Sequence, residues 1–445
     1  MKKSAQYITI DDFLKMLKNG DKIVGGMAAN EPQLIVSNLH LAFDKYNLDS
    51  LEFTNCLGIN QKAPIYTDKY KDKIEITSWF YDGAIRQAHN NGNASFIPNY
   101  LHYAAKKRFE RVQYDFFVSA ASMPDEHGFI SLSTCNVYEK DAVKSAKVTV
   151  LEVNPNFPRT FGDVEVHISE VDYLIKADYP APVLPEIPLN EKDITIGKLI
   201  AERIEDGSCI QLGIGGIPNA VAEALKGKKN LGIHTEMFTS TMVDLVECGA
   251  ADGSKKQLLQ GKHVCCFAFG SEKLYKFIDN NPSVLVMKGS FVNDPYIIGQ
   301  NDNQVSINAA LEVSLDGQVA SESIGPRQFS GAGGQVDTAV GAQNSKGGKS
   351  FIALYSTAMV RNPETGVREP KSKIVPIITP GGAVTLSRAD VDMVVTEYGV
   401  AELRGTSLKE RAIALIKIAH PDFREELFND AIKYGILSER DRVKL

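Results

Sequence analysis

Short runs of apolar, largely β-branched residues alternate with amphipathic stretches along most of this 445-residue chain, and this alternation constrains the fold more than any other feature. The chain has 35 glycines, which suit the tight turns between strands and helices. Strands joined through helices lie parallel, with helices on both faces of the sheet. The pattern predicts an α/β protein with a helix over 32–41, strands over 22–25 and 51–56, and buried strands over 115–119 and 147–153.

A proline-rich segment divides the chain into two parts. Residues 177–190 contain Pro180, Pro182, Pro185 and Pro188. Proline fixes φ and lacks an amide donor, so we expect this segment to be extended and stiff. A helical pattern follows over 193–205. We therefore predict one domain over 1–185 and a second over 186–445.

The second part begins with the same pattern as the first. Residues 23–56 have the order strand, glycine turn, helix, strand, and residues 210–236 repeat that order once a gap is allowed. Duplicated domains can place a site in the crevice between them. The sequence thus predicts two related open α/β domains with mostly parallel sheets and the active site between them.

The composition excludes several classes of protein. The net charge of −6 disfavours a general nucleic-acid binder, since phosphate contacts need clustered cations. No apolar run approaches the roughly 18 residues of a membrane span, and the N-terminus lacks the apolar core of a signal peptide. The six cysteines show no CxxC spacing. We expect reduced thiols, a cytoplasmic location and no membrane partner.

A glycine turn over 213–218 lies between a predicted strand and a predicted helix. Amide groups at such a helix start attract phosphates or carboxylates. Pro218 occupies the third glycine position of a dinucleotide fingerprint, and no Gly-Lys-Ser/Thr follows, so the turn matches neither that fingerprint nor a P-loop. A tight turn without a ligand is the alternative.

Glu236 follows an apolar strand pattern that begins at Leu231. The carboxyl ends of parallel strands point into the crevice where α/β proteins bind ligands. Beside a helix N-terminus this carboxylate would stay ionised and could act as a nucleophile or base. A helix cap or a solvated charge is the alternative.

The other candidate groups favour structural roles. Cys265 and Cys266 lie in an apolar strand pattern and are expected in the core. His127 lies in a turn-rich loop, where a role at a domain interface is the alternative. Asp163, Glu165 and His167 alternate as on an exposed face, and the eight histidines form no metal-binding motif, so we predict no metal site.

Six motifs in order give the chain a resemblance to the acetyl-CoA hydrolase/transferase family, most of all to its 4-hydroxybutyrate and butyryl-CoA:acetate CoA-transferases. The motifs lie at residues 122–128, 154–160, 213–220, 232–237, 395–405 and 419–424. The resemblance covers nearly the whole chain. It implies the CoA-transferase fold.

The resemblance also implies roles for individual residues. Glu236 becomes the nucleophile, and Asn293 and Gly334 become the groups that stabilise the oxyanion. The implied CoA contacts are Gly213, Ile214, Gly215, Gly216, Ile217, Gly333, Gly334 and Ala358. Residues 238–241 depart from the Ser-Asp-Gly turn usual in the family, which bears on acyl preference and not on the nucleophile.

The implied activity is transfer of CoA between a short-chain acyl-CoA and acetate, butyrate or 4-hydroxybutyrate. The reaction would be ping-pong through a glutamyl-CoA thioester, with CoA as a substrate, no permanently bound cofactor, and a homo-oligomer, dimer or tetramer, as the assembly. A glutamate of ordinary pKa would need no separate base. Three alternatives are an acyl-CoA hydrolase using the same nucleophile, a non-catalytic sensor of CoA or a carboxylate, and an NAD-dependent dehydrogenase, which Pro218 disfavours.

Overall fold

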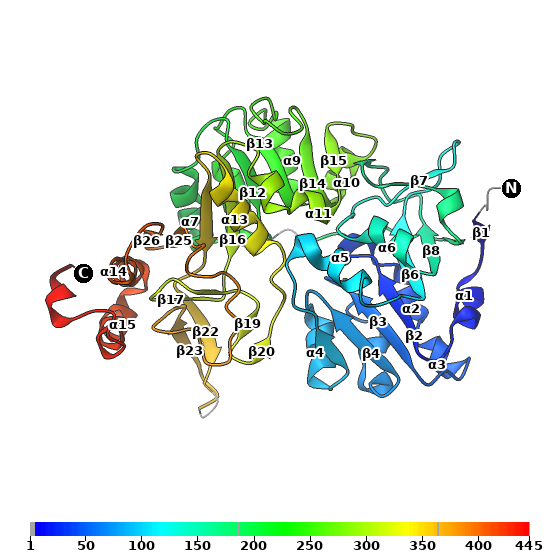
Figure 1. Ribbon diagram of the computed structural model, residues 1–445, viewed down its shortest axis with the longest axis horizontal. Helices are drawn as coiled ribbons and strands as arrows, with labels where there is room; N and C mark the ends of the chain where they lie inside the picture. Colours follow the sequence, from blue (N-terminus) through cyan, green and yellow to red (C-terminus); the bar gives the residue numbers. More distant parts are fainter. Residues whose placement is uncertain (1–4, 186, 363–364, 445) are drawn as a thin grey trace.

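The computed structural model describes residues 5–185, 187–362 and 365–444, and most of its strands belong to two large sheets (Figure 1). The first sheet is parallel throughout. Its strands, in spatial order, are β1 (Gln6–Tyr7), β11 (Tyr173–Lys176), β8 (Val148–Val153), β6 (Phe116–Ala121), β2 (Asp21–Gly25), β3 (Leu51–Asn55), β4 (Ile74–Ser78) and β5 (Ala94–Phe96).

The second sheet is built from the other half of the chain, with one added strand. Its order is β26 (Gly399–Glu402), β25 (Met393–Thr396), β21 (Lys349–Ala353), β16 (Gln304–Ala309), β12 (Cys209–Leu212), β13 (Gly232–Phe238), β14 (His263–Ala268), β15 (Val284–Val286) and β9 (Phe161–Gly162). Only β26 runs antiparallel to its neighbour. Because β9 comes from the first half, the halves are joined through this sheet as well as through the linker.

The two sheets share one topology. Numbered along the chain from β2 and from β12, seven strands in each half take the spatial order 7-6-5-1-2-3-4. The predicted fold class, two related and mostly parallel α/β halves, is therefore confirmed. In each sheet the strand order reverses beside the first strand, between β2 and β6 in one sheet and between β12 and β16 in the other. Such switch points are where ligands bind in open α/β sheets. The domain boundary at residue 186 stays a prediction, and residue 186 itself lies outside the described residues.

Helices cover the faces of both sheets. The longer ones are α4 (Gly83–Asn90), α7 (Glu191–Ala201), α8 (Gly216–Ala224), α9 (Ser240–Glu247), α13 (Gln335–Asn344), α14 (Leu408–Ile418) and α15 (Pro421–Lys433). The predicted helix over 193–205 is displaced: α7 begins at Glu191 because Asn190 and Asp193 form a capping box there. The predicted helix over 32–41 is two short ones, α2 (Gln33–Asn38) and α3 (Leu41–Asp44).

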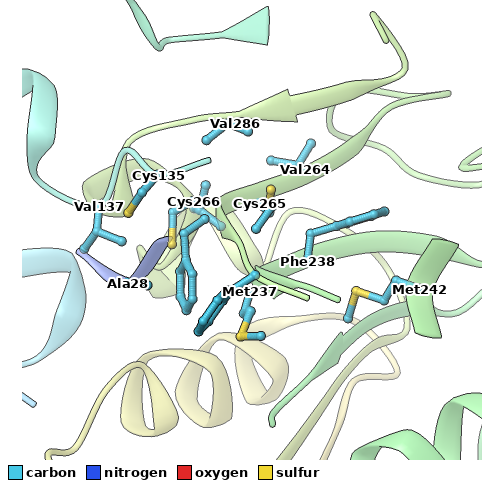
Figure 2. Packing of buried hydrophobic residues seen from close by; sticks show 14 of the residues in the cluster. Ala28, Cys135, Val137, Met237, Phe238, Met242, Val264, Cys265, Cys266 and Val286 are labelled. Atoms are coloured by element: carbon cyan, nitrogen blue, oxygen red, sulfur yellow. The ribbon is translucent and has the colours of Figure 1, made fainter. Parts of the chain in front are cut away.

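The largest hydrophobic cluster crosses from one half to the other. Figure 2 shows Ala28, Cys135 and Val137 of the first half beside residues of β13 and β14. The backbone joins them too, since the amide of Asn136 donates to the carbonyl of Cys266 at 2.8 Å. Residues of both halves thus pack around β13, which carries Glu236, and its neighbour β14. Among the described residues, no helix combines the length and apolarity needed to span a membrane.

Candidate active site

Glu236 lies on β13, two residues before the strand ends, where the ladder is interrupted. Thr235 pairs with Cys265 and Met237 with Phe267, but Glu236 has no partner in this register. On its other side β13 pairs with β12 only at Gly232 and Ile233, so the two strands separate before Glu236 is reached. The carboxylate therefore projects at an opening in the sheet, as expected of a group near the carboxyl end of a parallel strand.

Asn293 donates a hydrogen bond from Nδ2 to Oε2 of Glu236 at 3.0 Å. It follows the short helix α11 (Gly289–Val292) and is fully buried. Asp294 and Pro295 then begin α12 (Pro295–Ile298), where the Asp294 carboxylate caps the amide of Tyr296. Helix ends on both sides of Asn293 thus fix its backbone, and its amide group reaches the carboxylate, while its role at the oxyanion stays a prediction.

Gly334 lies against both groups. It is the N-cap of α13, and its amide donates to the Glu236 carboxylate. A Cβ atom at Gly334 would lie 1.9 Å from Oε2 of Glu236 and 2.0 Å from Nδ2 of Asn293. Since φ is −98°, glycine is needed here for space and not for conformation. Gly333 differs, because its φ of +55° favours glycine while its Cβ position is 3.7 Å from Oε1 of Glu236.

Burial, with a smaller contribution from the nearby carboxylate of Asp337, raises the pKa of Glu236 to about 7. The hydrogen bonds from Asn293 and Gly334 oppose this rise because they favour the charged form. The helix start that faces Glu236 is that of α13 and not that of α9, the next helix along the chain. The expectation of an ordinary glutamate pKa is thus wrong: burial outweighs the hydrogen bonds, and near pH 7 both protonation states are populated.

The first half of the chain contacts the glycine loop that carries Gly333 and Gly334. The amide of Tyr81 donates to the Ser330 carbonyl at 3.3 Å, and Nη1 of Arg86 donates to the Phe329 carbonyl at 2.7 Å. The ring of Phe80 lies 3.7 Å from the Cβ position of Gly333. Glu236 therefore lies where the two halves meet, with an aromatic ring of the first half close to the loop beside it.

The predicted CoA-binding turn over 213–217 joins β12 to α8. Gly215 has a φ of +117°, and the amide of Gly213 donates to the Ile307 carbonyl at 3.0 Å. A Cβ atom at Gly216 would lie 2.7 Å from a carboxylate oxygen of Asp193. The turn follows the first strand of the second sheet, at the switch point and next to β13. Its position suits a ligand, and its contact with CoA stays a prediction.

Ala358 is not brought together with Glu236. It lies on β22 (Thr357–Arg361), is exposed, and pairs with Lys371 of β23 (Arg368–Ser372). In Figure 1 this hairpin lies well away from β13. A CoA contact at Ala358 stays a prediction.

Of the remaining candidates, the burial of Cys265 and Cys266 is confirmed, and the other expected roles stay predictions. Cys265 and Cys266 are fully buried, and His127 is exposed in a turn. Asp163, Glu165 and His167 are half-buried and not on an exposed face as expected, and Asp163 pairs with Lys140 at 2.6 Å. Residues 238–241 run from the end of β13 into α9, where the Oγ atoms of Ser240 and Ser271 lie 3.0 Å apart. In the described parts of the chain, no group of three or more His, Cys, Asp or Glu side chains could hold a metal ion.

Sequence reasoning missed three supporting residues. Nε2 of His234 donates to the Val292 carbonyl at 2.8 Å, and burial lowers the pKa of this histidine to about 4, so it is a neutral support for the segment before Asn293. Strand alternation puts His234 on the same face as Glu236, which is a signal that could have found it. Asp337 binds Nδ1 of His102 at 2.7 Å, from 235 residues away, and no local pattern reveals that pair.

Comparison with known proteins gives consistent results. The acetyl-CoA hydrolase/transferase N-terminal domain model matches residues 2–185, and the C-terminal domain model of the same family matches residues 270–431. A succinyl-CoA:cyclohexane-1-carboxylate CoA transferase of Geobacter metallireducens is 44% identical over 93% of this chain and 92% of its own. A 4-hydroxybutyrate coenzyme A transferase of Clostridium kluyveri is 42% identical over 95% and 96%.

Solved structures extend this likeness to the fold. RipA from Yersinia pestis superposes with a TM-score of 0.89 at 32% identity, covering 97% of this chain and 98% of its own. A 4-hydroxybutyrate CoA-transferase from Porphyromonas gingivalis gives a TM-score of 0.78 at 34% identity, covering 96% and 98%. An acetyl-CoA hydrolase of Neurospora crassa is more distant, at 30% identity over 59% of this chain and 49% of its own.

Proposed function

The chain belongs to the acetyl-CoA hydrolase/transferase family and is an acyl-CoA:carboxylate CoA-transferase, and we propose that it moves CoA between short-chain acyl-CoA donors and acids such as acetate, butyrate or 4-hydroxybutyrate through Glu236. The observation that carries this proposal is the Glu236 carboxylate, held by Nδ2 of Asn293 at 3.0 Å and by the amide of Gly334. A carboxylate between two fixed donors is an oriented nucleophile whose donors can also stabilise an oxyanion.

The first half-reaction transfers CoA to the protein. An oxygen of Glu236 attacks the acyl carbonyl carbon, the C–S bond breaks, and CoA thiolate leaves an acyl-glutamyl anhydride. The thiolate then attacks Cδ of Glu236, which forms a glutamyl-CoA thioester and releases the acid as its carboxylate. The acceptor carboxylate reverses these two steps and carries CoA away. One thioester replaces another, no water is consumed, and the kinetics are ping-pong.

The donors around Glu236 act where charge develops. Each attack converts a planar carbonyl into a tetrahedral oxyanion, and one fixed donor is worth about 3 kcal/mol of transition-state stabilisation. No side chain has to remove a proton from the attacking carboxylate. Activity does require the ionised form, and the pKa of about 7 makes the ionised fraction sensitive to pH near neutrality.

The second candidate is acyl-CoA hydrolysis through the same intermediate, with water as the acceptor. The transferase relatives match nearly the whole chain at 42–44% identity, whereas the hydrolase matches 59% of it at 30%. The two activities separate in one measurement. A transferase consumes acyl-CoA in proportion to added carboxylate, whereas a hydrolase releases free CoA without it.

The covalent step is tested by incubating the protein with acyl-CoA alone and then with borohydride. Reduction of a glutamyl thioester gives an alcohol, which peptide mass spectrometry should locate at Glu236 together with loss of activity. The Glu236→Gln variant should show neither modification nor CoA exchange. A protein that stays unmodified and fully active after this treatment contradicts the covalent mechanism.

The assembly and location belong to the same proposal. We expect a homodimer or homotetramer in the cytoplasm, with CoA as a substrate and not as a resident cofactor. Size-exclusion chromatography with light scattering measures the assembly directly, and a monomer under assay conditions would contradict this part.

A further inference from the structure

Cys266 contacts both parts of the candidate nucleophilic site. Its Sγ atom lies 3.2 Å from the carbonyl oxygen of Glu236 and 3.6 Å from Oδ1 of Asn293, so these two oxygens share its single proton and the Glu236 carbonyl is the nearer acceptor. The residue lies on β14 at the position that would face Glu236 in the interrupted ladder, and it is fully buried. Figure 2 shows its side chain among Ala28, Cys135 and Met237, where the two halves of the chain meet.

The side-chain amide of Asn293 donates to Glu236 only when Nδ2, and not Oδ1, faces the carboxylate. An asparagine amide has one accepting oxygen and one donating nitrogen, and rotation by half a turn exchanges them. Glu236 alone does not decide the orientation, because its protonated form can donate to Oδ1 and its ionised form can accept from Nδ2. A third group that donates to Oδ1 reduces this ambiguity.

The Cys266 thiol can be that group. Burial raises its pKa well above the ordinary value, and the neighbouring Glu236, Cys265 and Glu139 raise it further. It therefore keeps its proton throughout the pH range in which Glu236 titrates. A protonated thiol is a weak donor and a weak acceptor; with Oδ1 on its side, as in this structure, it donates to the amide and leaves Nδ2 for the carboxylate.

We propose that Cys266 is a positioning residue: its S–H group holds the side-chain amide of Asn293 with the N–H bond directed at Glu236. The inference rests on the proposed role of Glu236 as the nucleophile. Cys266 touches no reacting atom and acts only through Asn293 and through the backbone of Glu236.

Loss of this donor should appear in the pH dependence of the reaction. The ionisable groups that bear on Glu236 are Asp337 of α13, Cys266 of β14 and Cys56 of the first half, and His102 of the first half binds Asp337. None of these but Cys266 contacts Oδ1 of Asn293 among the hydrogen bonds of the described residues. If the amide turns away, the pKa of Glu236 rises. A rise of one unit lowers the ionised fraction at pH 7 about fivefold and hardly changes it at pH 9.

The test compares Cys266→Ser, which keeps a donor, with Cys266→Val, which keeps the bulk and loses the donor. We expect Cys266→Val to lower kcat/KM at pH 7 about fivefold or more, with the acid limb of the pH profile moved to higher pH. Cys266→Ser should stay within about twofold of the parent. Cys265→Val is the matched control, because Cys265 is equally buried on the neighbouring position and faces neither group.

A double-mutant cycle decides the route of the effect. In an Asn293→Ala background, adding Cys266→Val should lower kcat/KM by less than about a further twofold, because the amide that Cys266 orients is gone. The inference is overturned if Cys266→Val matches the parent, if Cys266→Ser falls as far as Cys266→Val, or if the loss is undiminished in the Asn293→Ala background. A Glu236→Gln variant with full activity would instead contradict the proposed function itself.

Discussion

Replacing Gly334 with alanine adds one methyl group at the place where three groups of the site meet. That methyl would lie 1.9 Å from Oε2 of Glu236 and 2.0 Å from Nδ2 of Asn293. Carbon atoms of this kind do not approach other heavy atoms closer than 3.0 Å, so the carboxylate and the amide must each move by about 1 Å. The backbone at Gly334, with φ −98° and ψ 14°, needs no change to accept alanine.

The expected cost follows from this displacement. Misplacing a reacting group by about 1 Å can cost about 10²-fold in rate, and losing one fixed donor costs about 10²–10³-fold. Gly334→Ala should therefore lower kcat for CoA transfer by at least about 10²-fold. Asn293 is fully buried and cannot retreat freely, so the free energy of unfolding should fall as well, by about 1–3 kcal/mol.

The assay measures acyl-CoA formation from a donor acyl-CoA and acetate, on protein shown by circular dichroism to be folded. Gly227→Ala is the control, since its Cβ atom would meet nothing within 4 Å and its activity should equal that of the parent. A folded Gly334→Ala enzyme with kcat within about threefold of the parent would refute the reasoning. It would mean that the contact between α13 and Glu236 is not part of the reacting geometry.

Further predictions concern protonation. The acid limb of kcat/KM should report a pKa near 7, with activity falling as the pH drops, because only ionised Glu236 attacks; a profile flat from pH 5.5 to 8.5 would contradict this. Burial raises the pKa of Glu236 from 4.5 to about 7 in the folded state. The free energy of unfolding therefore falls as the pH rises from about 4.5 to about 7, because the ionised side chain is less stable in the folded protein than in the unfolded chain. Glu236→Gln should therefore raise the free energy of unfolding at pH 8 by up to about 3 kcal/mol in chemical denaturation, with the gain shrinking toward pH 4.5, and a gain independent of pH would argue against it. Asp337→Asn removes a charge that raises the pKa of Glu236, so its acid limb should shift to lower pH; no shift, in a variant that folds, would exclude that electrostatic coupling.

The sequence alone was sufficient wherever the cause is local. Strands and glycine turns were predicted from periodicity and from residues that favour turns, and β2, β3, β8 and β14 lie where they were expected. The burial of Cys265 and Cys266 was predicted from their apolar strand pattern. A lone glutamate near the end of a strand is a weak signal, and only the family motif over 232–237 led us to predict that Glu236 is the nucleophile. Where capping competed with the helical pattern, as at Asn190, the predicted bounds of α7 were displaced.

Only the tertiary structure decided how the site works. Asn293 is 57 residues from Glu236 along the chain, and Gly334 reaches it from the start of another helix, so no local pattern links the three. The pKa of about 7 depends on how much water the folded chain excludes, which a sequence position does not reveal. Cys266 is the clearest case. Its pattern predicted a buried thiol, and only the pairing of β13 with β14, interrupted at Glu236, and the approach of Asn293 bring that thiol and Asn293 together, because hydrogen bonds depend on distance in space and not on separation along the chain.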